Sequence, residues 1–539
     1  MDRDADSTTF LRPSDENRPL ARLAPVPGQR PPDSFPWTAA LIAAIIPLAH
    51  FAWQRNIGLS LWDEGFLWYG AQRVLAGEVP LRDFHAYDIG RYYFSATIMA
   101  VLNDAGIVAL RASNAIVQAI AVALGTYLLA RRARGLLFPL LSAVSLFIWM
   151  HFDFKATDYL AAIVLMAAFV LVIETPRMER FFACGALIGL VAILGRNHGV
   201  YGVIGSVLLF LYVFLPNRGN GSGRAFAAWS AGVIAGYAPM LVMIASTPGL
   251  PMAFLDSVLF LFEYGATNIA LPLPRPWWVR VQEHGLIPLL VAFQQIAIAL
   301  LIPTLPAFGV VALATMLIRR VLGKELDSLF VASACLALPY SHYTLSRADL
   351  AHLTFGILPF LIAILSFPLL TPRMRSIVAL TVLAISIVVI VPDRPGFHEV
   401  RDGGWQTIQV LGDHLRIDRY TEEEIRLLER LVERYAPGDT SFLAAPFWPG
   451  AYAAFNKRSP MWDIYPLVAR SERAQIAEIE RIRYVDPGFV VISDKALDGR
   501  DALRFRNTQP LIETFIRAHF VPVIDPGIPS YLRVYRRRG

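Results

Sequence analysis

Cysteine and charge are scarce in this sequence. Only two cysteines occur among 539 residues, Cys184 and Cys335, and each lies inside an apolar stretch without a partner at metal-motif or redox-motif spacing. Neither a disulfide framework nor a cysteine-ligated metal is therefore predicted. Charged residues make up 17% of the chain and hydrophobic residues 55%, with a mean hydropathy of +0.47. An ordinary soluble enzyme of this length is far less apolar, so the composition predicts a membrane protein.

A signal-peptide pattern and a continuous basic face are also missing. The first 36 residues are polar and rich in Pro, Asp and Arg, without the apolar run that a cleavable signal peptide needs near its start. We expect residues 1–36 to form a disordered cytoplasmic tail. The formal net charge is +6, but the basic residues form short clusters between apolar runs. That pattern indicates membrane topology and no nucleic-acid partner.

The remaining sequence is dominated by apolar segments. A helix needs about 20 mostly apolar residues to cross the hydrocarbon core of a bilayer. Eleven segments are candidates for this role, although several are short: 37–53, 107–130, 136–150, 159–173, 181–194, 200–215, 225–246, 285–318, 329–343, 355–370 and 377–391. The predicted fold class is an α-helical polytopic membrane protein with about eleven transmembrane helices and a C-terminal soluble α/β domain.

Basic clusters predict the orientation of these segments. Cytoplasmic loops carry the excess of Lys and Arg, and with the N-terminus inside, every cytoplasmic turn is basic: 131–134, 177–180, 217–224, 319–324 and 373–375. This topology requires segment 92–102 to be an interfacial helix and segment 285–318 to cross once. The latter is long enough to bend at Pro303 and Pro306 or to contain two segments. We predict a multi-pass protein of the cytoplasmic (inner) membrane.

Three regions follow from this topology. Residues 37–391 form the transmembrane domain, and its long first external loop spans residues 54–106. Residues 392–539 are polar and form an extracytoplasmic α/β domain, with an amphipathic helix at 421–434, strands at 441–445 and 489–493, and a hairpin at 519–537.

Two adjacent acids, Asp63 and Glu64, begin the polar part of the first external loop. Carboxylates at a membrane edge are costly to desolvate and need a purpose or a partner. One purpose is general-base catalysis on a hydroxyl group. The alternative is that one of them caps a helix that begins near Phe66.

Further acids follow in the first and second external loops. Asp88 and Arg91 stand among tyrosines that suit an interfacial aromatic belt, which leaves the two charged residues unexplained. Asp153 and Asp158 could join Asp63 around Mg²⁺ or Mn²⁺, because hard cations prefer carboxylate ligands. The alternative is that Asp158 caps a helix and Asp153 and Lys155 are exposed; the metal question stays open.

Several cations fall on the same predicted side. Arg347, Asp349 and His352 lie between two apolar spans, and arginine matches phosphate oxygens with a rigid fork of donors. An Arg347–Asp349 ion pair that holds two helix ends together is the alternative. Arg111, Arg196 and His198 complete a group of cations suited to an anionic lipid-linked substrate, although snorkelling explains a lone arginine.

The order of these features resembles the C-type superfamily of membrane glycosyltransferases, which includes protein O-mannosyltransferases, lipid A aminoarabinose transferases and bacterial relatives of families 39 and 83. The resemblance lies in Trp62-Asp63-Glu64-Gly65, in the stretch 69–77, in Asp88-Ile89-Gly90-Arg91-Tyr92-Tyr93, and in Leu110-Arg111-Ala112-Ser113. It implies that Asp63 is the catalytic base, that the donor is a polyprenyl-phosphate sugar, and that the product configuration is inverted.

The resulting hypothesis is sugar transfer from a polyprenyl phosphate to an envelope glycan, lipid or protein on the outer face of the membrane. Glu64 or Asp153 would orient Asp63 or hold a cation, and Arg347, supported by Arg111 or His352, would neutralise the leaving phosphate. A transporter or flippase of lipid-linked sugars is the main alternative, but the charges crowd at one membrane edge rather than at the midplane. A noncatalytic envelope scaffold is a third hypothesis.

Overall fold

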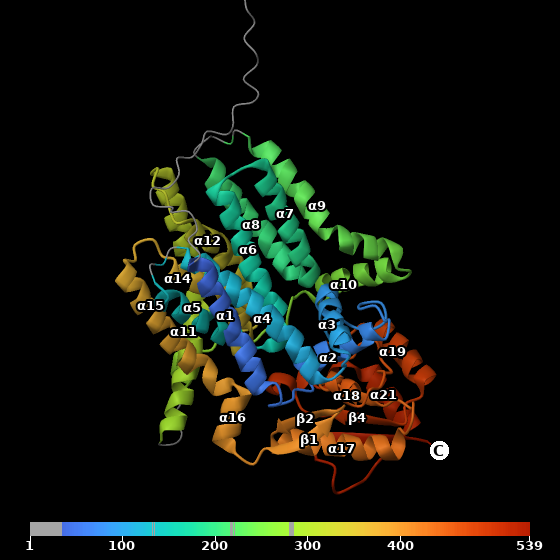
Figure 1. Cartoon of the computed structure of the whole chain (residues 1–539). Helices are drawn as coiled ribbons and strands as arrows, with labels where there is room; N and C mark the ends of the chain where they lie inside the picture. The colour runs from blue at the N-terminus through green and yellow to red at the C-terminus, as the bar shows by residue number, and fades with distance from the viewer. Residues whose placement is uncertain are drawn as a thin grey trace, which may run out of the picture.

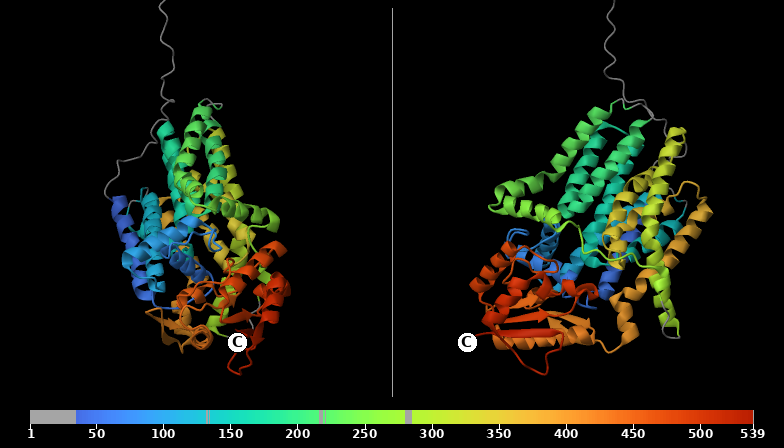
Figure 2. Two further views of the ribbon diagram at one scale, coloured as in Figure 1. Left: turned by 90° about the vertical axis from the view of Figure 1, so that its right-hand side faces the viewer. Right: turned by 180° about the vertical axis from the view of Figure 1, so that it is seen from behind.

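The computed structural model describes residues 35–538, apart from residues 132, 134, 216–218, 220 and 280–284. Long helices pack side by side into a bundle, and a smaller part with short strands lies at one end of it (Figures 1 and 2). The predicted tail 1–36, except its last two residues, lies outside the described residues, as do some positions of the predicted basic loops.

A helix, or a pair of helices, occurs at each of the eleven apolar segments. Seven of the described helices are long and apolar enough to cross a membrane. The polytopic helical fold class is thereby confirmed, and the count of eleven crossings stays a prediction. The helices are α1 (Phe35–Gln54), α4 (Ile107–Ala130), α5 (Leu137–Trp149), α6 (Ala156–Glu174), α7 (Met178–Leu194), α8 (Arg196–Phe214), α9 (Ser222–Ser246), α11 (Leu286–Val321), α12 (Ser328–Ser346), α13 (Leu350–Gly356), α14 (Leu358–Leu365) and α15 (Pro372–Ile390).

Prolines affect two of these segments differently. The tenth segment is divided into α13 and α14, and Pro359 stands in the first turn of α14, where a missing N–H costs nothing. In α11 the two prolines, Pro303 and Pro306, lie inside one continuous helix of 36 residues. Segment 285–318 is therefore a single helical element.

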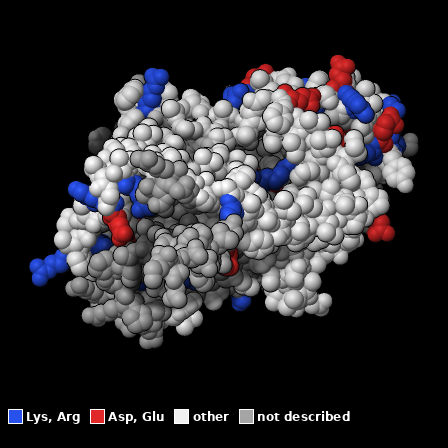
Figure 3. Space-filling model, turned by 90° about the horizontal axis from the view of Figure 1, so that it is seen from above, with Lys and Arg blue, Asp and Glu red and all other residues white. Residues whose placement is uncertain are grey.

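The first loop contains two helices, α2 (Asp63–Leu75) and α3 (Ile89–Leu102). Most of α2 is buried, including Trp68 and Tyr69. At the same end of the bundle, α10 (Leu250–Tyr264) follows α9 and projects sideways from it (Figure 1). Viewed from above, large uncharged areas of the surface separate groups of charged side chains (Figure 3).

The C-terminal part contains two small sheets. Strands β1 (Gln406–Val410) and β2 (Asp413–Ile417) form an antiparallel hairpin. A second sheet has the order β3-β4-β6-β5, in which only β3 and β4 run parallel. Its strands are β3 (Leu443–Ala445), β4 (Phe489–Ser493), β5 (Phe520–Pro522) and β6 (Leu532–Arg537), accompanied by α16 (Pro395–Asp402), α17 (Arg419–Tyr435), α18 (Pro449–Ala454), α19 (Glu472–Val485), α20 (Phe505–Thr508) and α21 (Pro510–His519).

Close backbone packing joins the C-terminal part to the first loop. A Cβ added to Gly65 would lie 2.5 Å from the Cα of Gly450, so α2 and α18 meet where neither residue has a side chain. The Gly450 amide donates to the Leu61 carbonyl at 2.9 Å, and Trp62 stacks on Phe447 with ring centroids 4.4 Å apart. This seam brings residues almost 400 positions apart in the chain next to Asp63.

Candidate active site

Asp63 lies in the first turn of α2, at the seam between the first loop and the C-terminal part. Trp62 occupies the N-cap position and no side chain caps the helix, so the predicted capping role of Asp63 is not found. The acid still benefits from the partial positive charge at a helix N-terminus. Asp63 is exposed to solvent, while the protein around it raises the pKa of its carboxyl above the ordinary value through desolvation.

Three cations and a phenol face Asp63. Lys155, His352 and Arg347 interact electrostatically with its carboxylate, and the hydroxyl of Tyr465 donates a hydrogen bond to it; all four oppose the rise in pKa caused by burial. The structure thus brings together two predicted residues, Arg347 and His352, with two that the sequence analysis did not select. We call Asp63, Lys155, Arg347, His352 and Tyr465 the Asp63 cluster.

Lys155 is positioned by aromatic rings and by one buried acid. It ends a short 3₁₀ turn, Asp153–Lys155, directly before α6. Its ammonium nitrogen lies 5.5 Å from the ring centroid of Tyr87 and 5.4 Å from that of Phe355, and 3.6 Å from a carboxylate oxygen of the fully buried Asp158. These contacts hold the cation in place beside Asp63. A lysine directly before an apolar span was the available sequence signal.

Arg347 is tied to two acids. Its Nε donates to Asp349 at 2.7 Å, as the alternative interpretation of the sequence expected. Its Nη1 and Nη2 also form a bidentate pair with Asp498 of the C-terminal part, at 2.8 and 2.6 Å. A second donation from Nη1 reaches the Ile269 carbonyl at 2.9 Å. An anionic ligand would therefore compete with Asp498 for this guanidinium.

His352 is held at both ring nitrogens. Nδ1 lies 2.7 Å from Asp349 Oδ1, and Nε2 lies 2.6 Å from the side-chain amide of Asn268. Burial alone would raise the pKa of Asp349, but its hydrogen bond with His352 and the charges of His352 and Arg347 bring it below the ordinary value. Asp349 is thus an ionised partner that orients both cations.

Glu64 and Arg111 form a buried pair with each other. Arg111 Nε and Nη2 donate to the two carboxylate oxygens of Glu64 at 2.7 and 2.9 Å. The remaining donors of Arg111 reach backbone carbonyls, including those of Arg55 and Gly58 at 2.8 Å each. The pair thus joins the start of α2 to α4. Glu64 is occupied by Arg111, which leaves Asp63 as the more accessible of the two acids.

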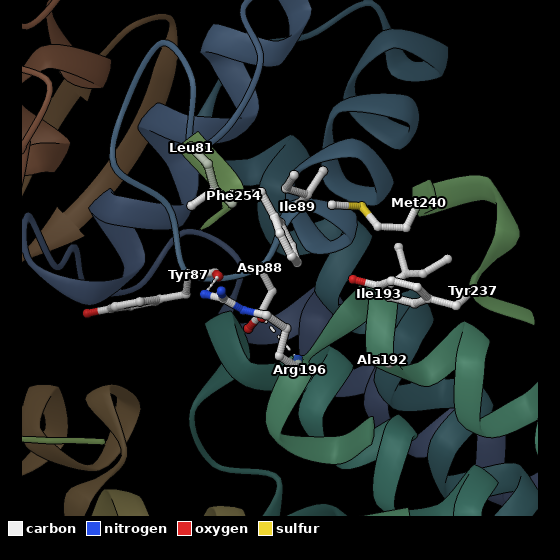
Figure 4. A pocket seen from close by; sticks show the side chains of 10 residues that line it. All are labelled: Leu81, Tyr87, Asp88, Ile89, Ala192, Ile193, Arg196, Tyr237, Met240 and Phe254. Carbon is white, nitrogen blue, oxygen red and sulfur yellow. Dashed lines mark hydrogen bonds and ion pairs between the residues drawn. The ribbon is translucent and has the colours of Figure 1, made fainter. Parts of the chain in front are cut away.

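Asp88 and Arg91 belong to a second buried network. Arg91 donates to Asp158 at 2.9 Å and lies 3.4 Å from Asp88. Asp88 also accepts from Arg196 at 3.2 Å, and Figure 4 shows these two side chains meeting in a pocket that Phe254, Tyr237 and Met240 border. His198 lies 3.7 Å from Asp158. The network links Asp88 and Arg91 to Lys155 through Asp158.

Asp153 lies elsewhere. Its carboxylate accepts a hydrogen bond from Gln118 at 2.9 Å and interacts with Arg394. Within the described ranges, no group of three or more His, Cys, Asp or Glu side chains has the arrangement of a metal site. The predicted joint site of Asp63, Asp153 and Asp158 is thus not assembled among the described residues.

The C-terminal part contributes side chains next to the Asp63 cluster that the sequence analysis did not identify. Besides Tyr465, it supplies Asp463, which lies 3.1 Å from His85 Nδ1 and accepts from Arg470 Nε at 2.9 Å. Burial opposes ionisation, but Arg470 and His85 lower the pKa of Asp463 well below its ordinary value. The ring centroid of Phe66 lies 4.8 Å from that of Tyr87 and 5.6 Å from that of Tyr465. Phe66 thus packs against both the first loop and the C-terminal part.

Comparison with known proteins gives similarity in structure only. No family model matches the chain, and no curated protein matches it in sequence. Among solved structures, ArnT from Cupriavidus metallidurans bound to undecaprenyl phosphate matches with a TM-score of 0.51 at 13% identity, over 92% of this chain and 96% of that chain. The chain thus shares its overall fold with ArnT.

Two further matches are weaker. ArnT from the same organism in the apo state gives a TM-score of 0.45 at 10% identity, over 92% of this chain and 96% of that one. The archaeal oligosaccharyltransferase AglB from Archaeoglobus fulgidus, in complex with an inhibitory peptide and a dolichol-phosphate, gives 0.43 at 12% identity, over 93% and 74%. The similarity in fold therefore rests on the match to ArnT with bound undecaprenyl phosphate, which agrees with the fold that the sequence resemblance implies.

Proposed function

We propose that this protein is an inverting glycosyltransferase that moves a hexosyl or pentosyl unit from a polyprenyl phosphate to an envelope glycan, lipid or protein. The Asp63 cluster carries the proposal: an accessible carboxylate faces Lys155, Arg347 and His352 in a chain with the fold of ArnT. The ArnT structure binds undecaprenyl phosphate, and cations next to a base suit a donor whose leaving group is a phosphate.

In the proposed reaction, Asp63 accepts the proton of the acceptor hydroxyl as its oxygen attacks the anomeric carbon from the face opposite the phosphate. The new glycosidic bond forms while the bond between the anomeric carbon and the phosphate oxygen breaks, and the polyprenyl phosphate leaves with the electron pair. A base with a pKa raised towards the working pH is more effective in this role. Lys155 and Arg347 neutralise the charge that develops on the leaving phosphate.

The other predicted residues take supporting parts in this proposal. The bidentate pair of Glu64 with Arg111 holds the first turn of α2, which carries Asp63, against α4. Asp88 and Arg91 hold the buried network that orients Lys155 through Asp158. His352 interacts with Asp63 and, together with Arg347, is oriented by Asp349.

A divalent cation at Asp63 does not fit the side chains present. Mg²⁺ and Mn²⁺ prefer several carboxylate or carbonyl oxygens, whereas the charges that face Asp63 are a lysine, an arginine and a histidine. We therefore assign the neutralisation of the phosphate to Lys155 and Arg347 and derive no step that depends on a metal.

We further propose that the N-terminus is cytoplasmic and that the Asp63 cluster and residues 392–539 face the outer side of the inner membrane. Basic residues lie at the junction of α6 and α7, from the last turn of α11 to the start of α12, and in the first turn of α15, and they support this orientation through the positive-inside rule. The first loop 54–106 and the C-terminal part lie together at the opposite end of the bundle (Figure 1).

The decisive experiment uses the full chain in proteoliposomes with a panel of polyprenyl-phosphate hexoses and pentoses labelled in the sugar, and an envelope extract as acceptor. We expect Asp63→Asn to lower transfer at least about 100-fold, with unchanged binding of undecaprenyl phosphate. Asp402→Asn is the matched control, because this acid pairs with Arg401 on exposed α16. Full transfer by Asp63→Asn contradicts the assignment, and donor that crosses the bilayer unconsumed indicates a transporter instead.

A further inference from the structure

A second site lies at the other end of α2. A cavity of about 380 Å³ opens between the last turn of this helix and the segments that follow α17 and α18, and Arg73, Lys457, Arg458, Asp439 and Phe455 are among the residues that line it. Ligand pockets of small organic molecules begin near this size. No residue of the Asp63 cluster is among the described residues that line this cavity.

The charge balance of this cavity favours an anion. Glu78 forms ion pairs with two guanidinium groups: its Oε1 lies 2.9 Å from Arg73 Nη2 and 3.0 Å from Arg458 Nε. Among the described residues that line the cavity, Arg73, Lys457 and Arg458 are basic and Asp439 is acidic. Asp83, which pairs with Arg82, also interacts with Arg458. Arg458 keeps 63% of its side chain exposed, so most of its donors remain accessible to a ligand.

Arg73 provides a second, independent observation. Its Nε is buried and has no hydrogen-bond partner among the described residues. A buried donor without a partner is unfavourable, and more so when it is charged. Helix capping accounts for Lys457, which donates to the carbonyls of Ala436 and Gly438 after α17. It does not account for Arg73 or for the exposed Arg458.

We propose that this cavity binds an anionic sugar unit of the acceptor glycan, with its carboxylate or phosphate at the exposed donors of Arg458, on the cavity side of the Arg73–Glu78–Arg458 bridge. The ring of Phe455 offers an apolar surface for the sugar, and arginine matches both anions with paired donors. Arg73 stands ten residues after Asp63 on the same helix, a separation of about 15 Å along its axis. A short oligosaccharide spans that distance, so the cavity holds one part of the acceptor while another part reaches the base.

That the bound sugar belongs to an acceptor rests on the proposed function, whereas its binding can be measured without any transfer. Binding to the detergent-solubilised full chain is measured by calorimetry, with trigalacturonate, neutral maltotriose and glycerol phosphate as probes. We expect trigalacturonate to bind and maltotriose not to bind. Competition by glycerol phosphate indicates a phosphate-bearing unit, and its failure indicates a uronate.

Arg458→Gln should weaken binding about tenfold or more, because hydrogen bonds to charged groups contribute about 1.5 to 3 kcal/mol. Arg419→Gln is the control, because this arginine is 85% exposed and pairs only with Glu423 among the described residues. Asp63→Asn should bind trigalacturonate like the unchanged protein even when transfer is lost, which separates this inference from the proposed function. Equal binding of trigalacturonate and maltotriose, no binding of either anion, or no effect of Arg458→Gln overturns it.

Discussion

Glu64 and Asp63 are neighbours in sequence, and the structure predicts opposite consequences when each is neutralised. In Glu64→Gln, the buried guanidinium of Arg111 loses the carboxylate that both Nε and Nη2 contact. Glu64 and Arg111 are only 9% and 8% exposed, so solvent cannot replace the lost charge. Breaking a buried ion pair from one side costs about 3 to 5 kcal/mol. Because glutamine keeps one acceptor oxygen, we expect a loss near 3 kcal/mol.

Thermal unfolding in detergent with a thiol-reactive dye measures this loss. Cys184 and Cys335 are both fully buried, so they react only when the helices open. The midpoint should fall by several degrees in Glu64→Gln and stay unchanged in Asp63→Asn, because Asp63 is an exposed residue whose carboxylate keeps a hydrogen-bond acceptor for Tyr465 when it becomes an amide. A double-mutant cycle with Arg111→Gln should show that the two losses are not additive. An unchanged midpoint in Glu64→Gln, or a lowered one in Asp63→Asn, would refute the division of roles.

Three further changes test the contacts of the C-terminal part. Tyr465→Phe removes a hydrogen bond that lowers the pKa of Asp63. Since the base acts when deprotonated, the ascending limb of the pH–rate profile should move to higher pH, and an unmoved limb contradicts the contact. Asp498→Asn frees donors of Arg347, so undecaprenyl phosphate should bind several-fold more tightly in a native mass-spectrometry titration; weaker binding would count against it. Gly450→Ala places a Cβ 2.8 Å from first-loop backbone and should cost about 1 to 3 kcal/mol, measured as faster proteolysis at the seam.

Sequence reasoning located the membrane helices because their signal is local. A run of about 20 apolar residues with polar ends specifies a spanning helix without reference to the rest of the fold. The predicted segment 107–130 coincides with α4, and 489–493 coincides with β4. The amphipathic stretch 421–434 likewise lies within α17, because one face of this helix supplies buried residues such as Ile425 and Leu428.

The site was only partly accessible to such reasoning. The cost of desolvating a charge at a membrane edge marks Asp63 as a candidate, and it marks Glu64 and Arg111 equally. It does not reveal that Glu64 and Arg111 pair with each other across 47 positions. Lys155 has no local pattern that distinguishes it from a lysine at the membrane interface. Tyr465 lies about 400 residues from Asp63, and no local pattern encodes a contact that depends on how the first loop and the C-terminal part pack into one hydrophobic core.

The origin of each contact suggests how the two substrates are separated. Lys155, Arg347 and His352 lie at or near the ends of bundle helices, where the proposed lipid-linked donor would place its phosphate, whereas Tyr465 and Arg458 belong to the C-terminal part. Asp498 is the exception, since it reaches from that part to Arg347. An incoming phosphate must displace this carboxylate before it can use both terminal nitrogens of the guanidinium. In the proposed reaction, donor binding would therefore alter a contact between the two parts of the molecule, and the Arg347–Asp498 pair would be where occupancy of the donor site is communicated to the acceptor side.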